Sequence, residues 1–262
     1  MRLDKLLSNL GVASRAECRR LLRAGRVRVA GECWRDGARN VPEGAEICMD
    51  GVPLDTRTVR HLMLNKPAGV LTATEDGKQA TVMELLPALY RACGCMPVGR
   101  LDKDTTGLLL LTTDGTLAHR LIAPERHVDK VYEAEVEGAL EEADIAAFAQ
   151  GIPLKDFTAL PARMEILSAG EDESRARVQV REGKFHQIKR MFGALGHEVT
   201  ALSRLTFGAL SLPEELPPGQ YRELTEEELA ALRQEAGLAG PEEPEQSEPS
   251  EQPEQPERNE NA

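Results

Sequence analysis

Residues 98–112 of the chain read VGRLDKDTTGLLLLT, a charged segment followed at once by an apolar one. The apolar run at residues 107–112 has the length and composition of a β-strand that is buried on both faces, and Asp114-Gly115 is expected to end it. Four charged residues come just before this run: Arg100, Asp102, Lys103 and Asp104. Charged side chains rarely lie beside a buried strand without a partner or a chemical role. The segment therefore predicts a functional site next to a buried strand.

The patterns around this segment mix helices and strands without an internal repeat. Alternating or continuous apolar runs predict strands at residues 62–64, 70–72, 107–112, 131–137 and 175–181. Apolar side chains with helical spacing predict a helix over residues 188–195, which Gly196 closes. The segment Thr225-Glu-Glu-Glu228 is a capping box that begins the last helix. The fold class is therefore α+β, with a mixed or antiparallel sheet.

The first 59 residues are expected to form a small N-terminal module. Ser14 is a suitable N-cap for a helix through Ala24, and short strands are expected at residues 26–29 and 45–49. Six arginines follow this helix and the strand after it: Arg15, Arg19, Arg20, Arg23, Arg26 and Arg28. Because only Glu17 interrupts this stripe, we interpret it as a binding surface rather than as an ion-paired, solvated helix face. A stripe of this kind suits the phosphate backbone of a folded RNA.

Charge is distributed unevenly along the chain. The net charge of −12 at pH 7 would by itself argue against an RNA partner. However, residues 1–28 hold eight Arg and Lys against two Asp and Glu, whereas residues 235–262 hold one against nine. From Pro241 onward the composition is too polar to offset the entropy of ordering, so residues 235–262 are predicted to be a disordered acidic tail rich in Pro, Glu and Gln. The basic charge is therefore concentrated at the N-terminus.

Composition also excludes several classes of protein. No window approaches the run of about 18 apolar residues that a membrane span needs, and the N-terminus has no apolar signal core, so a cytoplasmic protein without a membrane partner is expected. The five cysteines are odd in number and form no CxxC pair, which indicates neither a disulfide framework nor a zinc site.

The charged segment itself suggests two other chemistries. The side chains at residues 102–107 imitate the start of a calcium-binding loop, but the twelfth position is Thr113, where such a loop requires a bidentate Glu. A pair of catalytic carboxylates like that of a glycosidase would need a second acid, which no other pattern marks. The sequence therefore indicates neither a metal site nor a glycosidase-like pair of acids here.

Several stretches resemble known families. Residues 1–32, MRLDKLLSNLGVASRAECRRLLRAGRVRVAGE, resemble the start of an S4-type RNA-binding domain. Residues 99–115, GRLDKDTTGLLLLTTDG, resemble the catalytic motif of pseudouridine synthases, and KVY at 130–132 and GKFHQIKRM at 183–191 resemble their second and third motifs. With LNKPAG at 64–69, the likeness to the RsuA family of small-subunit (16S) rRNA pseudouridine synthases extends over residues 1–234.

The resemblance implies an S4-type RNA-binding domain at residues 1–59 and a pseudouridine synthase catalytic domain at residues 60–234. The reaction breaks the N1–C1′ bond of a uridine and rejoins the uracil through C5, so it is an isomerisation that needs no cofactor. The implied catalytic residues are Asp102, which would add covalently to the ribose or the base; Lys189, which would pair with Asp102; and Tyr132, which would stack on the extruded uracil and help remove the C5 proton. Arg100 and His186 are the implied substrate-binding residues.

Each of these residues also has a structural interpretation when it is taken alone, such as a core tyrosine for Tyr132 or a surface lysine for Lys189. Two other functions also remain open. The first is the same chemistry on large-subunit (23S) rRNA. The resemblance implies that the third motif of those enzymes lacks the His-Gln pair that His186 and Gln187 form here. The second is a non-catalytic RNA-binding factor of ribosome assembly, against which the intact catalytic set argues. The expected partner is ribosomal RNA within a partly assembled small subunit, and the chain is expected to be a monomer.

Overall fold

The computed structural model describes residues 1–238. The segment predicted to be disordered from Pro241 onward lies outside the described residues. The helices are α1 (Leu3–Asn9), α2 (Arg15–Arg23), α3 (Ala88–Ala92), α4 (Gly115–Ile122), α5 (Glu142–Gln150), α6 (Gln187–Ala194) and α7 (Glu226–Glu235), with short 3-10 helices η1 (Val82–Leu85) and η2 (Pro124–Arg126).

The strands are β1 (Val27–Val29), β2 (Glu32–Cys33), β3 (Ile47–Met49), β4 (Val52–Pro53), β5 (His61–Lys66), β6 (Met96–Pro97), β7 (Thr106–Thr112), β8 (Lys130–Glu137), β9 (Arg163–Ala169), β10 (Glu173–Val180), β11 (Val199–Phe207), β12 (Leu210–Ser211) and β13 (Tyr221–Glu223). Among residues 1–238, no helix has the length and apolar character that crossing a membrane requires.

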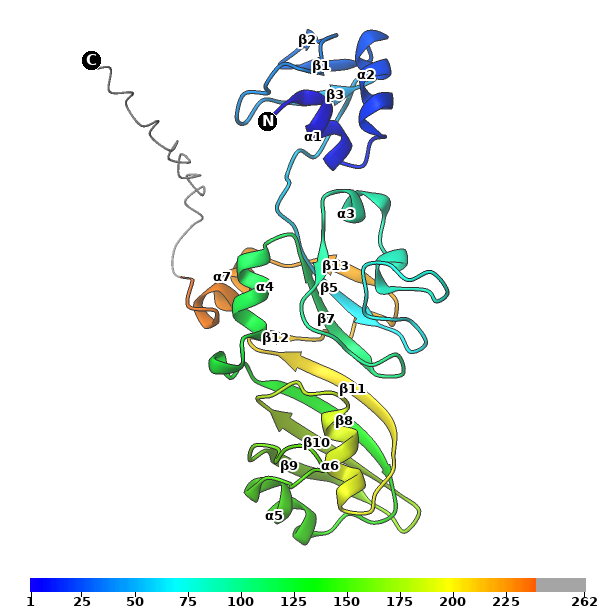
Figure 1. Cartoon of the computed structure of the whole chain (residues 1–262), viewed down its shortest axis with the longest axis vertical. Coiled ribbons are helices and arrows are strands. Elements are labelled where there is room, and N and C mark those ends of the chain that lie inside the picture. The colour runs from blue at the N-terminus through cyan, green and yellow to red at the C-terminus, as the bar shows by residue number, and fades with distance from the viewer. Residues whose placement is uncertain (239–262) are drawn as a thin grey trace, which may run out of the picture.

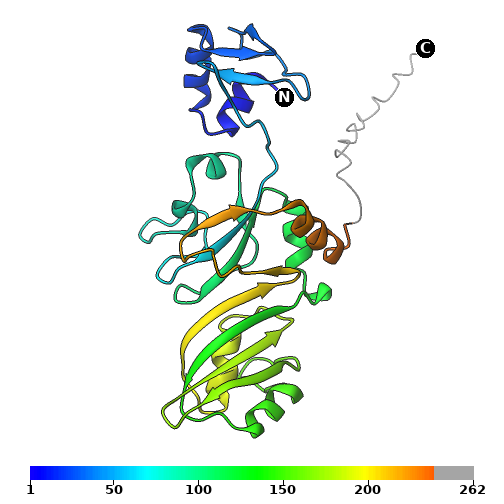
Figure 2. The same cartoon turned by 180° about the vertical axis from the view of Figure 1, so that it is seen from behind.

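The N-terminal module lies at one end of the long axis of the molecule, and α5 lies near the other end (Figures 1 and 2). Its four strands pair in the order β2-β1-β3-β4, and α1 and α2 cover them, so that Leu7 and Leu22 of the helices and Ile47 of β3 are fully buried in one core. As predicted, Ser14 caps α2, since its hydroxyl accepts a hydrogen bond from the backbone N–H of Glu17.

The rest of the described chain is built on one large sheet. Its strands follow the order β13-β5-β7-β11-β8-β10-β9, while β6 pairs with β7 and β12 with β11. Every pairing is antiparallel except that of β7 with β11, which joins Ser203 to Thr106 and Arg204 to Gly107. The predicted mixed sheet is therefore confirmed, and this short parallel contact connects its two halves.

The apolar run at residues 107–112 is continuous because both faces of strand β7 are buried. Leu109 and Leu111 belong to the core that α5 and α6 cover, whereas Leu108 and Leu110 belong to the core on the opposite face, which α4 and α7 cover. All four side chains are fully buried. Complete burial of a leucine contributes about 1.5–3 kcal/mol, so this strand contributes to two cores at once, as its sequence predicts.

Glycine is required at position 107, where the two halves meet. Gly107 has a φ of +97°, and a Cβ added there would overlap the backbone nitrogen and carbonyl oxygen of Arg204. Both the left-handed backbone and the close approach of β11 therefore depend on the missing side chain.

Strand β7 ends at Thr112, just before Asp114, as predicted; in addition, the carboxylate of Asp114 accepts from the N–H of Leu117 and so caps α4. Two other predictions about elements need correction. Residues 70–72 form no strand; Leu71 makes one isolated bridge to Thr81. The tail expected from residue 235 begins later, since Glu235 ends α7 and Ala236 is fully buried.

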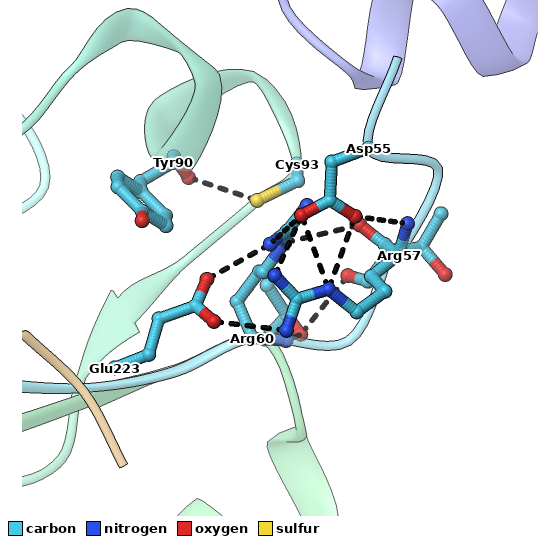
Figure 3. A network of polar contacts seen from close by, with 8 residues as sticks. Asp55, Arg57, Arg60, Tyr90, Cys93 and Glu223 are labelled. Atoms are coloured by element: carbon cyan, nitrogen blue, oxygen red, sulfur yellow. Dashed lines mark hydrogen bonds and ion pairs between the residues drawn. The ribbon is translucent and has the colours of Figure 1, made fainter. Parts of the chain in front are cut away.

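The linker between the module and the large sheet is held by charged contacts (Figure 3). The buried guanidinium of Arg60 donates to Asp55 in the linker and to Glu223 on β13, at 2.9 and 2.8 Å. Arg57 donates to the same two carboxylates. In addition, Leu89 of α3 packs against the core of the module. The module is thus attached to the sheet by ion pairs and by one apolar contact.

Candidate active site

Asp102 lies in the loop between β6 and β7, and the segment after β5 fixes this loop. The ammonium of Lys66 donates to the backbone carbonyls of Pro67, Lys103 and Thr105 at 2.9 to 3.1 Å. The hydroxyl of Thr72 donates to the carbonyl of Leu101 at 2.7 Å and accepts from its N–H. Residues 66–72 therefore hold the loop on both sides of Asp102, Lys66 after it and Thr72 before it.

Lys66 is a cation with no exposed surface. Burial lowers the pKa of its ammonium to about 8, although Asp104 and Asp102 act in the opposite direction. Three carbonyl acceptors satisfy the three N–H groups of the charged form. The protonated ammonium is therefore a structural part of the Asp102 loop.

The carboxylate of Asp102 is partly exposed and faces an imidazole and an ammonium group. Its Oδ1 lies 3.5 Å from Nε2 of His186, and its Oδ2 lies 3.9 Å from Nζ of Lys189. His186 has a left-handed backbone (φ 49°) and Lys189 lies in the first turn of α6. The start of α6 thus brings both residues to the carboxylate from 84 and 87 residues along the chain.

The closest partner of Lys189 differs from the predicted one. Its Nζ lies 2.6 and 2.7 Å from the two carboxylate oxygens of Asp104, which are its hydrogen-bond acceptors. This hydrogen bond holds the pKa of Asp104 below its usual value. The expected pairing with Asp102 is therefore a longer, secondary contact, because one ammonium lies between two carboxylates.

A narrow pocket of about 60 Å³ opens at Asp102. It brings together four of the predicted site residues, Arg100, Asp102, Tyr132 and His186, whereas Lys189 reaches Asp102 from outside the lining. Tyr132 extends from β8 and is almost fully buried, so it forms a wall of the pocket. A partly exposed carboxylate at the entrance of such a pocket can act as a nucleophile on a group that enters it, and the phenol can contact the face of a ring.

Comparisons with known proteins agree with this geometry. A family model for RNA pseudouridylate synthases matches residues 60–194, and a model for the S4 domain matches residues 1–47. The chain belongs to the RNA pseudouridylate synthase family.

Relatives of this pseudouridylate synthase match over nearly their whole length. It is 44% identical to an uncharacterized RNA pseudouridine synthase, YtzG, of Bacillus subtilis, with 89% of this chain and 99% of the relative covered. It is 40% identical to ribosomal small subunit pseudouridine synthase A of Yersinia pestis, with 88% and 98% covered. A crystal structure of a pseudouridylate synthase matches with a TM-score of 0.62 at 34% identity, covering 88% of this chain and 99% of that one.

The pocket of the pseudouridylate synthase contains residues that sequence reasoning missed. Thr105 is 2% exposed, and its hydroxyl has no hydrogen-bond partner within residues 1–238. Beside the pocket, Phe185 is 70% exposed and stacks on His186 with ring centroids 3.8 Å apart. An exposed aromatic ring is a signal that the sequence offered, whereas an unpartnered hydroxyl is visible only in the structure.

Gln187 has a structural contact in the same loop. Its amide donates to Glu182 and accepts from the N–H of Lys184. It therefore closes the loop that precedes α6, and this positions His186 at the pocket.

The arginines of the S4 domain are more strongly paired than predicted. The fully buried carboxylate of Asp4 accepts from Arg2, Arg15 and Arg19. The expectation that only Glu17 interrupts the stripe was wrong, because Asp4 reaches it from α1. Further partners hold three more of the arginines: Arg20 pairs with Glu17, Arg26 with Asp50, and Arg28 with the carbonyl of Gly31.

These pairs leave the surface cationic. Arg15 and Arg19 remain 46% and 47% exposed while they share one carboxylate, and Arg23 is exposed. Asp4 thus holds the guanidinium groups in place without neutralising all of them. In residues 1–238 of the synthase, no group of three or more His, Cys, Asp or Glu side chains lies close enough together to hold a metal ion.

Proposed function

We propose that this pseudouridylate synthase isomerises a uridine of small-subunit (16S) rRNA to pseudouridine, with Asp102 as the nucleophile. The observation that carries the proposal is the position of Asp102, at a narrow pocket between Tyr132 and the side chains of His186 and Lys189 at the start of α6. Relatives named ribosomal small subunit pseudouridine synthase A, at 38–40% identity over 98–100% of their length, support the choice of substrate.

The reaction conserves atoms and electrons. The N1–C1′ bond of the flipped uridine breaks, the uracil turns, and a C5–C1′ bond forms while C5 loses a proton and N1 gains one. The carboxylate of Asp102 adds to the ribose or the base and is released again, so it is regenerated. His186 and Lys189 orient this carboxylate and stabilise its charge.

The walls of the pocket would hold the uracil. Tyr132 offers a ring face for stacking and a phenol group that can help remove the C5 proton. The unpartnered hydroxyl of Thr105 gives the uracil edge a hydrogen-bonding group. Arg100, which is exposed at the entrance, contacts an RNA phosphate or holds the flipped nucleotide.

The two domains divide the work. Residues 1–59 bind the rRNA through Arg15, Arg19, Arg20, Arg23, Arg26 and Arg28, while residues 60–234 carry the chemistry. Three cations around one carboxylate leave a net positive patch, which suits the phosphates of a structured RNA. The enzyme acts as a monomer in the cytoplasm on a partly assembled small subunit.

The test maps pseudouridine in both rRNAs of a strain that lacks the gene. We expect one 16S pseudouridine to disappear and to return with the wild-type gene but not with Asp102→Asn. The amide keeps the shape of the side chain but lacks the nucleophilic oxygen pair, so folding and RNA binding should be retained. A site lost from 23S rRNA instead would assign the large subunit, and near-normal turnover by the Asn variant would remove Asp102 from its role.

A further inference from the structure

A second cavity, of about 270 Å³, adjoins the catalytic pocket. Tyr132 and Arg100 line both, so the two spaces share a wall. The lining of the second cavity combines apolar side chains, Ile122, Pro124 and Leu160, with the cations Lys130, Arg181 and Arg204. A mixed lining of this kind fits a ligand that is partly flat and apolar and partly anionic.

Two of these cations, the buried Arg204 and the half-buried Lys130, form no hydrogen bond or ion pair with a carboxylate in residues 1–238. Arg204 is 2% exposed; its Nε donates to the carbonyl of Leu108 at 2.7 Å, and its Nη2 has no hydrogen-bond partner within residues 1–238. The ammonium of Lys130 donates to the carbonyl of Val128 at 2.7 Å. Both groups lie over the ring of Phe207, at 5.0 and 5.5 Å from its centroid.

The nearby acids have other partners. Asp129 is paired with Arg181 at 2.9 Å, and Glu182, which lines the cavity, is paired with Lys184 at 3.0 Å. Glu235 accepts from the N–H of Ala209 at 2.9 Å; it attracts Lys130 from a distance, as Asp129 does, but forms no ion pair with it. Burial, and then repulsion by Arg204, lower the pKa of Lys130 to about 8. Buried charge without a partner is costly, and an anion bound between the two cations would remove this cost.

We propose that this cavity binds the nucleotide next to the target uridine, with its backbone phosphate on Lys130 and Arg204 and its apolar face against Ile122, Pro124 and Leu160. This inference rests on the proposed function for the identity of the ligand. It assigns to Lys130, which stands two residues before Tyr132, the task of anchoring the strand while the uridine lies on the other side of the Tyr132 ring.

The experiment measures binding of two dinucleotides to the full chain by calorimetry. One is UpU; the other is the same dinucleotide with a neutral methylphosphonate linkage. Each probe has a single linkage between its two nucleosides. The methylphosphonate therefore removes the one phosphate charge that Lys130 and Arg204 are proposed to bind. We expect the wild-type protein to bind UpU about tenfold more tightly than the neutral probe, the effect of one charge-assisted hydrogen bond.

Variants locate the effect. Lys130→Met should bind the two probes equally, and Lys130→Arg should keep most of the preference, because it keeps the charge. Arg120→Met removes one charge from the exposed part of α4 outside the cavity, so it is the matched control and should behave like wild type. Thermal unfolding of each variant checks the fold. Arg204→Met is a second variant with the same expected result, useful if Lys130→Met unfolds.

The outcomes separate this inference from the proposed function. Equal binding of both probes by wild type, or a Lys130→Met variant that keeps the preference, would overturn the subsite even if the enzyme modifies 16S rRNA. Loss of affinity for both probes to the same extent would also overturn it, since Lys130 would then only support the strand of Tyr132. A charge preference that depends on Lys130, in a protein that modifies no 16S uridine, would keep the subsite and reject the proposed substrate.

Discussion

At the scale of single residues, the ammonium of Lys189 is divided between two carboxylates. It is hydrogen-bonded to Asp104 and lies 3.9 Å from Asp102. Asp104 is 73% exposed, so its bond to Lys189 is screened by water. A bound nucleotide that displaces water from the pocket would strengthen the attraction to Asp102 more than that to Asp104.

Substitutions of Lys189 test this division. Lys189→Met removes the charge but keeps the aliphatic stem, and the single-turnover rate should fall by about two powers of ten if the ammonium contributes about 3 kcal/mol to the transition state. Lys189→Arg should retain much of the activity, because it keeps a cation of similar reach. RNA affinity should change little in either variant. Equal rates for the two variants, or a loss confined to binding, would place Lys189 on the RNA instead.

The sequence predicted which residues meet, but not every distance between them. Asp102, Tyr132 and His186 come together as the motif resemblance implies, since motif order reflects a shared fold. The hydrogen bond from Lys189 to Asp104 was not predicted. Asp102 and Asp104 lie two residues apart in the same loop, so the sequence does not show which of the two carboxylates is nearer to Lys189. Only the backbone path of the loop decides which carboxylate points at the helix.

At the scale of elements, the position of the loop that carries Asp102 depends on the segment that follows β5. Lys66, Gly69 and Thr72 all hydrogen-bond the backbone at residues 101–105. This clamp replaces the strand that was predicted at residues 70–72. The backbone of Leu71 pairs with residues 80–82, and the side chain of Thr72 holds the neighbouring loop, which an apolar pattern does not reveal.

We expect deprotonation of Lys66 to lower the activity at alkaline pH. Its pKa of about 8 means that the ammonium loses a proton, and with it one of three hydrogen bonds, as pH rises through 8. The single-turnover rate should therefore fall with an apparent pKa near 8. In Lys66→Arg, which stays charged, this decline should move to higher pH.

Unfolding would not explain such a decline. The folded pKa of Lys66 lies below its usual value of 10.5, so between about pH 8 and 10.5 the folded protein binds fewer protons than the unfolded chain. This residue's contribution to stability therefore rises over that range, while the rate falls. Urea unfolding measured at pH 7.5 and 9 provides the control, and an unchanged alkaline decline in Lys66→Arg would contradict the assignment.

The pairing of α1 with α2 gives a second prediction at this scale. Burial raises the pKa of Asp4, but the hydrogen bonds from Arg19, Arg2 and Arg15 outweigh burial and hold the pKa well below its usual range. Its contribution to stability is therefore present above the pKa of the unfolded state, about 3.9, and is lost as pH falls further through the folded pKa.

Asp4→Asn should therefore destabilise the N-terminal module by about 1–3 kcal/mol, less than a fully buried pair because its arginines are half exposed. Trp34 is the single tryptophan of the chain and is buried in this module, so its fluorescence follows unfolding of the module alone. The urea midpoint from Trp34 should fall in the variant, and its loss relative to wild type should shrink at strongly acidic pH. An unchanged midpoint would mean that Asp4 only orients the arginines.

At the scale of the whole molecule, the module and the sheet meet through a short linker. Asp55, Arg57 and Arg60 fix that linker to Glu223 of β13 (Figure 3). The residues that make these contacts lie in the linker and on β13. They are about 40 or more residues in sequence from the catalytic motif at residues 99–115, and they belong to none of the family's motifs. The sequence therefore defines the N-terminal module but does not show how this module is attached to the large sheet.

Deletion of residues 1–59 should weaken binding to 16S rRNA while the isolated catalytic domain still folds. Binding by the full chain should also fall steeply with salt, because each neutralised phosphate releases condensed counterions. The deletion should make this salt dependence shallower. Filter binding at several salt concentrations measures both effects, and equal affinity of the two proteins at every concentration would remove the module from RNA recognition.

The parallel contact between β7 and β11 also sets the order in which the chain can assemble on the ribosome. Strand β7 pairs early with β5, and β6 covers Leu111 and Thr112 on its second edge, but Thr106 and Gly107 on that edge wait for a partner that begins about 90 residues later. At about 5–20 residues per second of synthesis, that wait is on the order of ten seconds. During it, the start of this strand presents an open edge, which is a site for misassociation. The nascent chain is therefore most exposed to aggregation, and most in need of a chaperone, in the interval before residues 199–207 leave the exit tunnel.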